Sequence, residues 1–218
     1  MTDDKQKYDF IPDLENPSNV HHIERAMVPM NAYVLDVGCH TGILGAVLKK
    51  DKSATVIGID VDAAALQIAR SRISEALLLN VEEAGWEQVL ITQGWKQFDV
   101  ILFGDVLEHT RDPESILMAA KKLLKPGGRI VVSIPNVAHW RVRLGLLLGN
   151  FQYTESGILD KTHLRFFTSK TGRELLNRCG YTITASDVAG YDLPHWLIRL
   201  LPGLLAIQLV FAATPTST

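Results

Sequence analysis

The chain alternates short runs of β-branched and apolar residues with longer stretches of helical periodicity, and this feature constrains its fold more than any other. The pattern is typical of a mostly parallel sheet covered by helices on both faces, because each parallel crossover needs room for a helix. It therefore predicts an α/β three-layer sandwich with seven strands. The expected strands are 33–37, 55–60, 76–80, 98–103, 129–134, 181–188 and 206–213, and the expected helices are 18–28, 42–50, 62–74, 113–124 and 169–179.

The length and composition indicate one ordinary globular domain. At 218 residues the chain is long enough for one large α/β domain, so we expect a single domain over 1–218. Its net charge of -2 gives no whole-protein attraction to nucleic acid or to an anionic membrane, although a local basic patch is compatible with it. The two cysteines show neither a disulfide framework nor metal-ligand spacing, which favours a reducing compartment.

Neither end of the chain predicts a membrane segment. The first residues, MTDDKQKYDF, are polar and acidic where a signal peptide needs a basic start and an apolar run. The apolar stretch 196–213 is interrupted by Arg199 and by Pro202-Gly203, which leaves it short of the roughly 20 residues of a span. We therefore expect a cytoplasmic protein with no membrane partner.

One long connection departs from the regular alternation. Residues 137–168 are too long for an ordinary crossover and carry an apolar helical pattern of their own. Long loops that a rigid scaffold positions frequently carry function. We expect this segment to form a lid over the substrate.

The loop after the first strand, VLDVGCHTG at residues 34–42, indicates a ligand site. Such a loop lies at the carboxyl edge of the sheet, where Gly38 and Gly42 let the backbone approach a ligand. Its spacing differs from the G-x-G-x-x-G pattern that brings a pyrophosphate to a helix start. A carboxylate at Asp36, two residues before the first glycine, suits a cationic amino-acid ligand better than a phosphate.

The ends of the next two strands supply further candidate ligand residues. Asp60 ends the second strand, where a carboxylate can accept hydrogen bonds from a ribose diol. Asn80 ends the third strand and could bond an adenine edge, which Val61 and Val81 would flank. Taken singly, each glycine or aspartate of these loops is equally well explained as a structural residue, a glycine that shapes a loop or an aspartate that caps a helix.

Together these segments resemble the class I S-adenosylmethionine-dependent methyltransferases over roughly residues 18–188. The resemblance rests on VLDVGCHTG, VIGIDVD (56–62), FDVILFGDVLEH (98–109) and LLKPGGRIVVSIPN (123–136), in the order of the family. It implies a Rossmann-like seven-stranded sheet with an antiparallel last strand, and S-adenosylmethionine as cofactor. The cofactor residues that it implies are Asp36, Gly38, His40, Gly42, Asp60, Val61, Asn80, Val81 and Gly104. The chain departs from the family pattern at His40, where glycine is usual, and at Asn80, where aspartate is common.

Candidate catalytic residues follow the fourth strand. Asp105, Glu108 and His109 have the spacing i, i+3 and i+4, which places three side chains on one face of a helical turn. Such groups could act as a general base or bind a metal. The alternative is structural: a capping aspartate, a solvated glutamate and a packed histidine.

These residues also resemble a cluster of ubiquinone-type O-methyltransferases and of small-RNA 3′-end 2′-O-methyltransferases. In those families an acid-x-x-Glu-His cluster and a later histidine hold a divalent cation beside the acceptor hydroxyl. The resemblance implies Asp105, Glu108, His109 and His163 as metal ligands here, with Asp105 where those families have glutamate. Carboxylates with imidazole suit Mg²⁺, Mn²⁺ or Zn²⁺, any of which would lower the pKa of a hydroxyl. The predicted catalytic residues are His109, His163 and Asp105.

The expected lid carries Arg141, Arg143, Lys161 and Arg165 among aromatic residues. These cations could grip an anionic or sugar-containing substrate, or they could be solvated or paired with nearby acids. The segment IPNVAHWRVRLGLLLGNFQYTESGILDKTHLRFFT resembles methyltransferases associated with bacterial surface-glycan synthesis. The resemblance implies a small-molecule acceptor, such as a hydroxyl of a sugar or glycan precursor.

Other functions are compatible with parts of the sequence. A non-catalytic, cofactor-binding subunit of a metabolic enzyme shares the early motifs, but members of that family are shorter after the fifth strand. An NAD-dependent oxidoreductase is disfavoured because G-x-G-x-x-G is absent. RNA methylation fits the acid-histidine cluster, but the slightly acidic chain shows no separate basic and aromatic module.

Overall fold

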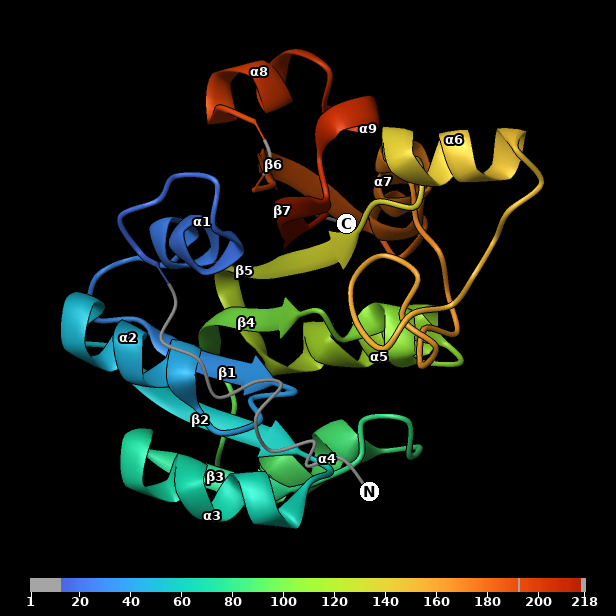
Figure 1. Ribbon diagram of the computed structural model, residues 1–218. Coiled ribbons are helices and arrows are strands. Elements are labelled where there is room, and N and C mark those ends of the chain that lie inside the picture. The colour runs from blue at the N-terminus through green and yellow to red at the C-terminus, as the bar shows by residue number, and fades with distance from the viewer. Residues whose placement is uncertain (1–12, 192, 217–218) are drawn as a thin grey trace.

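A computed structural model of the protein describes residues 13–191 and 193–216. The described chain forms one seven-stranded sheet in the order β3-β2-β1-β4-β5-β7-β6 (Figure 1). The first five strands pair in parallel, and β7 runs antiparallel to both β5 and β6. The strands are β1 (Tyr33–Val37), β2 (Thr55–Asp60), β3 (Glu75–Leu78), β4 (Phe98–Gly104), β5 (Leu124–Pro135), β6 (Tyr181–Ala189) and β7 (Gln208–Pro215). The predicted seven strands and the antiparallel last strand are confirmed.

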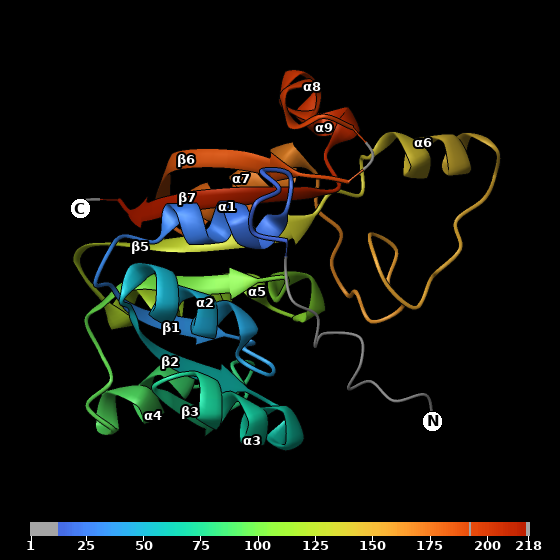
Figure 2. The same ribbon diagram turned by 60° about the vertical axis from the view of Figure 1, so that its left-hand side comes forward.

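Helices cover both faces of this sheet, as predicted (Figure 2). One apolar core lies between the sheet and α4, α5 and α7, and a second lies between the sheet and α1, α2 and α3. The α-helices of the core layers are α1 (Val20–Met27), α2 (Ile43–Lys52), α3 (Ala63–Arg72), α4 (Trp86–Thr92), α5 (Pro113–Ala120) and α7 (Ser169–Arg178). Three further helices, α6 (Trp140–Leu147), α8 (His195–Leu200) and α9 (Pro202–Leu205), lie at one end of the molecule.

The structure differs from the predicted elements at a few places. Helix α4 was not predicted, because a seven-residue segment rich in β-branched residues has little helical propensity and is stabilised by the burial of Trp86 and Leu90. Strand β3 ends at Leu78, because the chain turns after the amide of Leu79 donates to the Asp60 carbonyl. The predicted helix 113–124 stops at Ala120 and continues as a short 3-10 turn.

The predictions about a membrane span and a signal peptide can be compared with the structure only in part. In the described part of the chain, none of the helices has the length and apolar character needed to cross a bilayer. The sequence of residues 1–10 does not predict a signal peptide, and these residues lie outside the part of the chain that the structure describes. The single domain over 1–218 stays a prediction.

A glycine in β2 lets the loop after β1 pack onto the sheet. A Cβ atom at Gly58 would lie 2.5 Å from Cys39 Sγ and 2.5 Å from Ile73 Cδ1. Cys39 belongs to the predicted ligand loop, and Ile73 follows α3. The missing side chain of Gly58 therefore allows the loop and the helical layer to approach the sheet at the same point.

We predict that Gly58→Ala destabilises the protein by about 1–3 kcal/mol, because the added methyl group overpacks a filled site. Chemical denaturation should show the loss as a lower midpoint. The matched control is Gly203→Ala in α9, where a Cβ would meet nothing within 4 Å. Equal midpoints for Gly58→Ala and the unchanged protein would contradict this account of the packing.

Candidate active site

A cavity of about 820 Å³ lies at the carboxyl edge of the sheet. The loops after β1, β2, β3 and β4 line it, together with α1, the segment 156–163, Tyr191 and the start of β7. Of the residues predicted for the site, all except Gly42 line this cavity. They are Asp36, Gly38, His40, Asp60, Val61, Asn80, Val81, Gly104, Asp105, Glu108, His109 and His163.

The loop after β1 takes its shape from residues with left-handed backbone conformations. Gly38 has φ of +71°, and a Cβ there would lie 2.6 Å from Val106 Cγ2, so this position requires glycine. His40 has φ of 45°, a conformation that glycine adopts without strain, at the position where the family pattern has glycine. Gly42 caps α2 with φ of 74° and packs toward Ala69 instead of facing the cavity.

Asp36, at the carboxyl end of β1, is a buried carboxylate with an unsatisfied oxygen. Its side chain is 4% exposed, and Oδ2 has no hydrogen-bond partner among the described residues. Burial, with the nearby charge of Glu24 added, raises the pKa of Asp36 to about 7. A buried polar atom without a partner costs free energy, so this oxygen is placed to receive a donor from a ligand.

Helix α1 adds three residues to the cavity that the sequence did not predict, Val20 and the titratable pair His21 and Glu24. Glu24 is 1% exposed, and its Oε2 lies 2.9 Å from His21 Nδ1. Burial alone would lower the pKa of His21, but the hydrogen bond and charge of Glu24 outweigh it and raise the pKa. The sequence carried a signal for Glu24, because it shares the buried helix face of Val20 and Ile23.

Asp60, at the end of β2, is fixed by two backbone amides. Its Oδ2 accepts from the His40 amide at 2.7 Å, and its Oδ1 accepts from the Asp62 amide at 2.8 Å. Each carboxylate oxygen can accept more than one hydrogen bond, so the side chain is both held in place and able to accept from a ligand hydroxyl. Asn80 and Val81 line the cavity beyond it.

Acidic side chains dominate the wall of the cavity. Among the described residues that line it there is no lysine or arginine. The acids in the wall are Glu24, Asp36, Asp60, Glu82, Asp105, Glu108 and Asp160. Such a surface favours a cationic ligand and opposes a phosphate, so the residues present fit S-adenosylmethionine, which carries a sulfonium and an ammonium group.

Glu108, His109 and His163 come together in the same cavity. One potential ligand atom of each lies within 4.8 Å of the others. Both carboxylate oxygens of Glu108 are buried and have no hydrogen-bond partner among the described residues. Burial, reinforced by the charge of Asp105, raises the pKa of Glu108 well above its ordinary value. A buried carboxylate beside two imidazoles fits a divalent cation.

Backbone hydrogen bonds bring these distant residues together. The Glu108 carbonyl accepts from the amides of Leu164 and Arg165, at 2.8 and 3.0 Å. His163 Nδ1 donates to the Ile158 carbonyl at 3.1 Å, since a carbonyl oxygen can only accept. In a neutral imidazole this bond leaves the lone pair on Nε2, the atom that could bind a metal or accept a proton.

Asp105 does not join this group, and its predicted place on one helical face with Glu108 and His109 is wrong. Asp105 has φ of 52°, and only Leu107–His109 form a 3-10 turn. Its carboxylate accepts from Gln208 Nε2 at 2.7 and 2.6 Å and from Ser133 Oγ at 3.3 Å. Burial raises the pKa of Asp105 to about 6, and these hydrogen bonds oppose the shift. Gln208 of β7 was not predicted, because no motif marks it.

The predicted lid contributes a loop to the cavity, but its cations do not line it. Ser156, Gly157 and Ile158 belong to the cavity wall. The four cations have other contacts: Arg141 lies over Trp140, Arg143 donates to the Ala138 carbonyl, Lys161 pairs with Glu155, and Arg165 donates to the Arg111 carbonyl. A role for these cations in substrate binding therefore has no support from their positions.

The family model and the relative that match this sequence are both methyltransferases. The sequence matches the family described as Methyltransferase domain over residues 13–186. It is 32% identical over 123 residues to the ubiquinone biosynthesis O-methyltransferase of Coxiella burnetii. The matched region covers 56% of this chain and 52% of that enzyme. The chain therefore spans about half the length of the curated relatives it matches.

Two solved structures have a similar fold. A possible histamine N-methyltransferase from Thermotoga maritima has a TM-score of 0.65 at 19% identity, covering 90% of this chain and 87% of that chain. The 1,6-didemethyltoxoflavin-N1-methyltransferase of Burkholderia thailandensis, solved with S-adenosylhomocysteine, has a TM-score of 0.61 at 19% identity, covering 94% and 79%. At this identity the likeness concerns the fold.

The raised pKa of Asp36 predicts a pH-dependent stability. Its pKa rises from 3.8 to about 7 on folding, so the folded protein binds more protons than the unfolded chain between these values. The contribution of protonated Asp36 is therefore fully present below pH 4 and is lost as the pH rises through 7. Asp36→Asn should stabilise the ligand-free protein by about 1–3 kcal/mol at pH 8 and have a smaller effect at pH 5.

The same substitution should weaken binding of S-adenosylhomocysteine at least about tenfold, since a charge-assisted contact is lost. Melting temperatures at the two pH values and calorimetric titration measure the two effects. A variant that binds normally, or that is less stable than the unchanged protein at pH 8, would show that Asp36 is a structural residue.

Proposed function

The chain belongs to the class I S-adenosylmethionine-dependent methyltransferases, whose Methyltransferase domain it matches over residues 13–186, and from this premise we propose that it methylates a hydroxyl of a small-molecule acceptor. The observation that supports this proposal is that one cavity holds both the residues expected to bind the cofactor and those expected to activate the acceptor. The same wall carries the buried Asp36 and the Glu108, His109 and His163 group. Donor and acceptor sites would therefore adjoin one another. The family also excludes the alternative of an NAD-dependent oxidoreductase.

The residues that would hold S-adenosylmethionine lie in the loops after β1, β2 and β3. We assign its amino-acid part to the loop from Asp36 to Thr41, its ribose to Asp60, and its adenine to Val61, Asn80 and Val81. When bound, the cofactor supplies an electrophilic methyl group on a sulfonium. Displacement at that carbon needs an in-line acceptor, so the work of the chain is to fix positions and exclude water.

The proton of the acceptor hydroxyl must leave during the transfer. Glu108, His109 and His163 are the groups that we assign to this task. A divalent cation held by them would lower the pKa of the hydroxyl, and without an ion an imidazole Nε2 is the candidate base. Asp105 is assigned a positioning role, because Gln208 and Ser133 already occupy its carboxylate.

The acidic wall also restricts the acceptor. A phosphorylated or polyanionic acceptor would be repelled by the cavity, which disfavours nucleic acid and nucleotide-linked sugars. A neutral hydroxyl compound meets no such penalty. The O-methyltransferases of ubiquinone biosynthesis among the relatives support methyl transfer to oxygen, while a sugar hydroxyl stays a prediction from the lid segment.

We predict that Glu108→Gln and His163→Ala each lower the rate of methyl transfer by at least about 100-fold, because both remove a group that activates the acceptor. The measurement is transfer of labelled methyl to a panel of neutral hydroxyl compounds. His22→Asn is the matched control, since His22 does not line the cavity. Normal rates in both variants would refute the role of this group.

Chelation separates the two routes of proton removal. If an ion is bound, a chelator should abolish transfer, and Mg²⁺ or Mn²⁺ should restore it. Full activity in a metal-free sample would leave an imidazole as the base. Binding of S-adenosylhomocysteine without transfer to any acceptor, with a partner enzyme at equal stoichiometry, would instead indicate an accessory subunit.

A further inference from the structure

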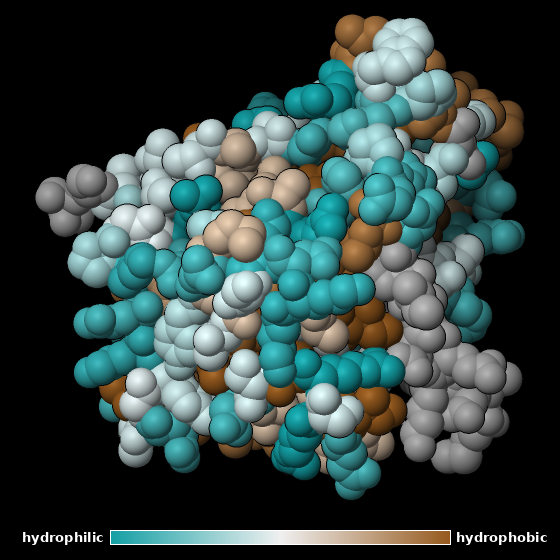
Figure 3. Space-filling view, turned by 90° about the vertical axis from the view of Figure 1, so that its left-hand side faces the viewer, coloured by the Kyte–Doolittle hydropathy of each residue, from teal (hydrophilic) through white to brown (hydrophobic). Residues whose placement is uncertain are grey.

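Exposed apolar side chains gather on α6 and α8 and at the residue that follows each of them, and with the short helix α9 we call this region the α6–α9 surface (residues 140–148 and 195–205). Of the 18 exposed large hydrophobic side chains in the described chain, eight lie here. They are Trp140, Leu144, Leu146, Leu147, Leu148, Trp196, Leu200 and Leu201, and Leu147 is 82% exposed. In Figure 3, brown hydrophobic atoms gather at the top of the molecule, where Figure 1 places α8 and α9. So dense a group of exposed apolar residues marks an interaction site.

The helices of this surface are joined to one another. Arg143 of α6 donates to the Gly203 carbonyl of α9 at 3.0 Å. Asn136, which is buried before α6, donates to the Ala206 carbonyl after α9 at 2.9 Å. Figures 1 and 2 both place α6 beside α9. Helices α6 and α8 are therefore held on the same side of the molecule through α9.

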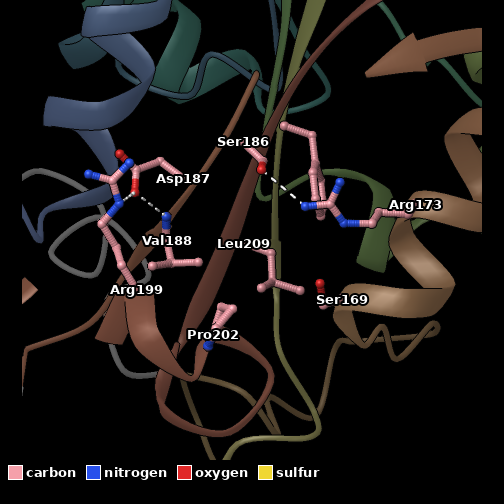
Figure 4. Close-up of a pocket in the computed structure, with 9 residues that line it drawn as sticks. Ser169, Arg173, Ser186, Asp187, Val188, Arg199, Pro202 and Leu209 are labelled. Atoms are coloured by element: carbon pink, nitrogen blue, oxygen red, sulfur yellow. Dashed lines mark hydrogen bonds and ion pairs between the residues drawn. The ribbon is translucent and has the colours of Figure 1, made fainter. Parts of the chain in front are cut away.

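The charge of this surface is opposite to that of the whole chain. Residues 140–148 and 195–205 contain three arginines and no acid, whereas the net charge of the chain is -2. Arg143 is held by backbone carbonyls, which neutralise no charge. Figure 4 shows Arg199 of α8 turned toward Asp187 of β6, and its Nε lies 3.4 Å from Oδ1, so its charge is partly compensated. Arg141 and Arg143 are the two exposed arginines of α6.

The α6–α9 surface adjoins the active-site cavity. Pro135, Tyr191 and Ile207 line the cavity, and they are near chain neighbours of α6, α8 and α9 respectively. The surface is therefore joined to the wall of the cavity through short chain segments.

We propose that the α6–α9 surface binds an anionic lipid bilayer, with its apolar side chains in the interface and its arginines at the headgroups. Tryptophan and leucine together with arginine are the residues of interfacial anchors. A second copy of the chain fits less well, because a twofold contact would bring the same arginines of both copies together. The expectation of no membrane partner came from the lack of a predicted membrane segment and from the net charge, and neither describes this local surface. The proposal is independent of the methyl acceptor.

Flotation with lipid vesicles tests the proposal. The unchanged protein should float with vesicles of phosphatidylcholine and phosphatidylglycerol and bind pure phosphatidylcholine vesicles much more weakly. Arg141→Gln should weaken binding about fivefold, as expected for one headgroup cation, and high salt should have a similar effect. The double variant Leu147→Glu/Trp196→Glu should lose binding at least about tenfold, because each change removes exposed apolar area from the interface.

The matched control is Met118→Glu in α5, which changes a hydrophobic side chain 53% exposed outside the surface and should float normally. The double variant should keep its melting temperature and its stabilisation by S-adenosylhomocysteine, which separates loss of lipid binding from loss of fold or cofactor site. Absence of binding to anionic vesicles, or equal binding by the double variant, overturns the proposal. So does a dimer in sedimentation equilibrium that the double variant dissociates, because a second copy would then cover the surface.

Discussion

A buried carboxylate with one unpartnered oxygen is the constraint on which the site depends. Asp36 lies at the end of β1, between β2 and β4, where its side chain is buried in the wall of the cavity. Glu24 and Asp60 add negative charge around it, which His21 opposes only in part. Burial of like charges is unfavourable unless a cation compensates them. Burial of Asp36 therefore carries an electrostatic cost in the ligand-free protein, and we expect a cationic cofactor to reduce it on binding.

The acceptor side of the cavity depends on a second connection, between the turn after β4 and the loop at residues 163–165. The Glu108 carbonyl holds that loop through two amides, so the residue that offers its carboxylate to the cavity also positions His163. Because the Glu108 carbonyl is hydrogen-bonded to the loop that carries His163, the backbone itself brings the carboxylate and the imidazoles together. Glu108, His109 and His163 line the same cavity as the residues proposed to hold the cofactor.

Much of this organisation could be predicted from the sequence, because strand periodicity and loop glycines are local signals. The seven strands, the shape of the loop at Gly38 and the position of Asp60 follow from such patterns. Residues that meet only through the tertiary fold could not be predicted in the same way. Gln208 reaches Asp105 across the sheet without any motif, and Asp105 left its expected helical turn because its backbone is left-handed. For the same reason the sequence left open whether the lid cations face the cavity, because composition does not fix the direction of a side chain.

The central claim is that this cavity binds S-adenosylmethionine. Thermal unfolding with S-adenosylhomocysteine and, separately, with NAD tests it most directly, because a ligand that binds the folded state raises the melting temperature by mass action. The account predicts a saturable rise with S-adenosylhomocysteine and none with NAD. Stabilisation by NAD and none by S-adenosylhomocysteine would contradict it.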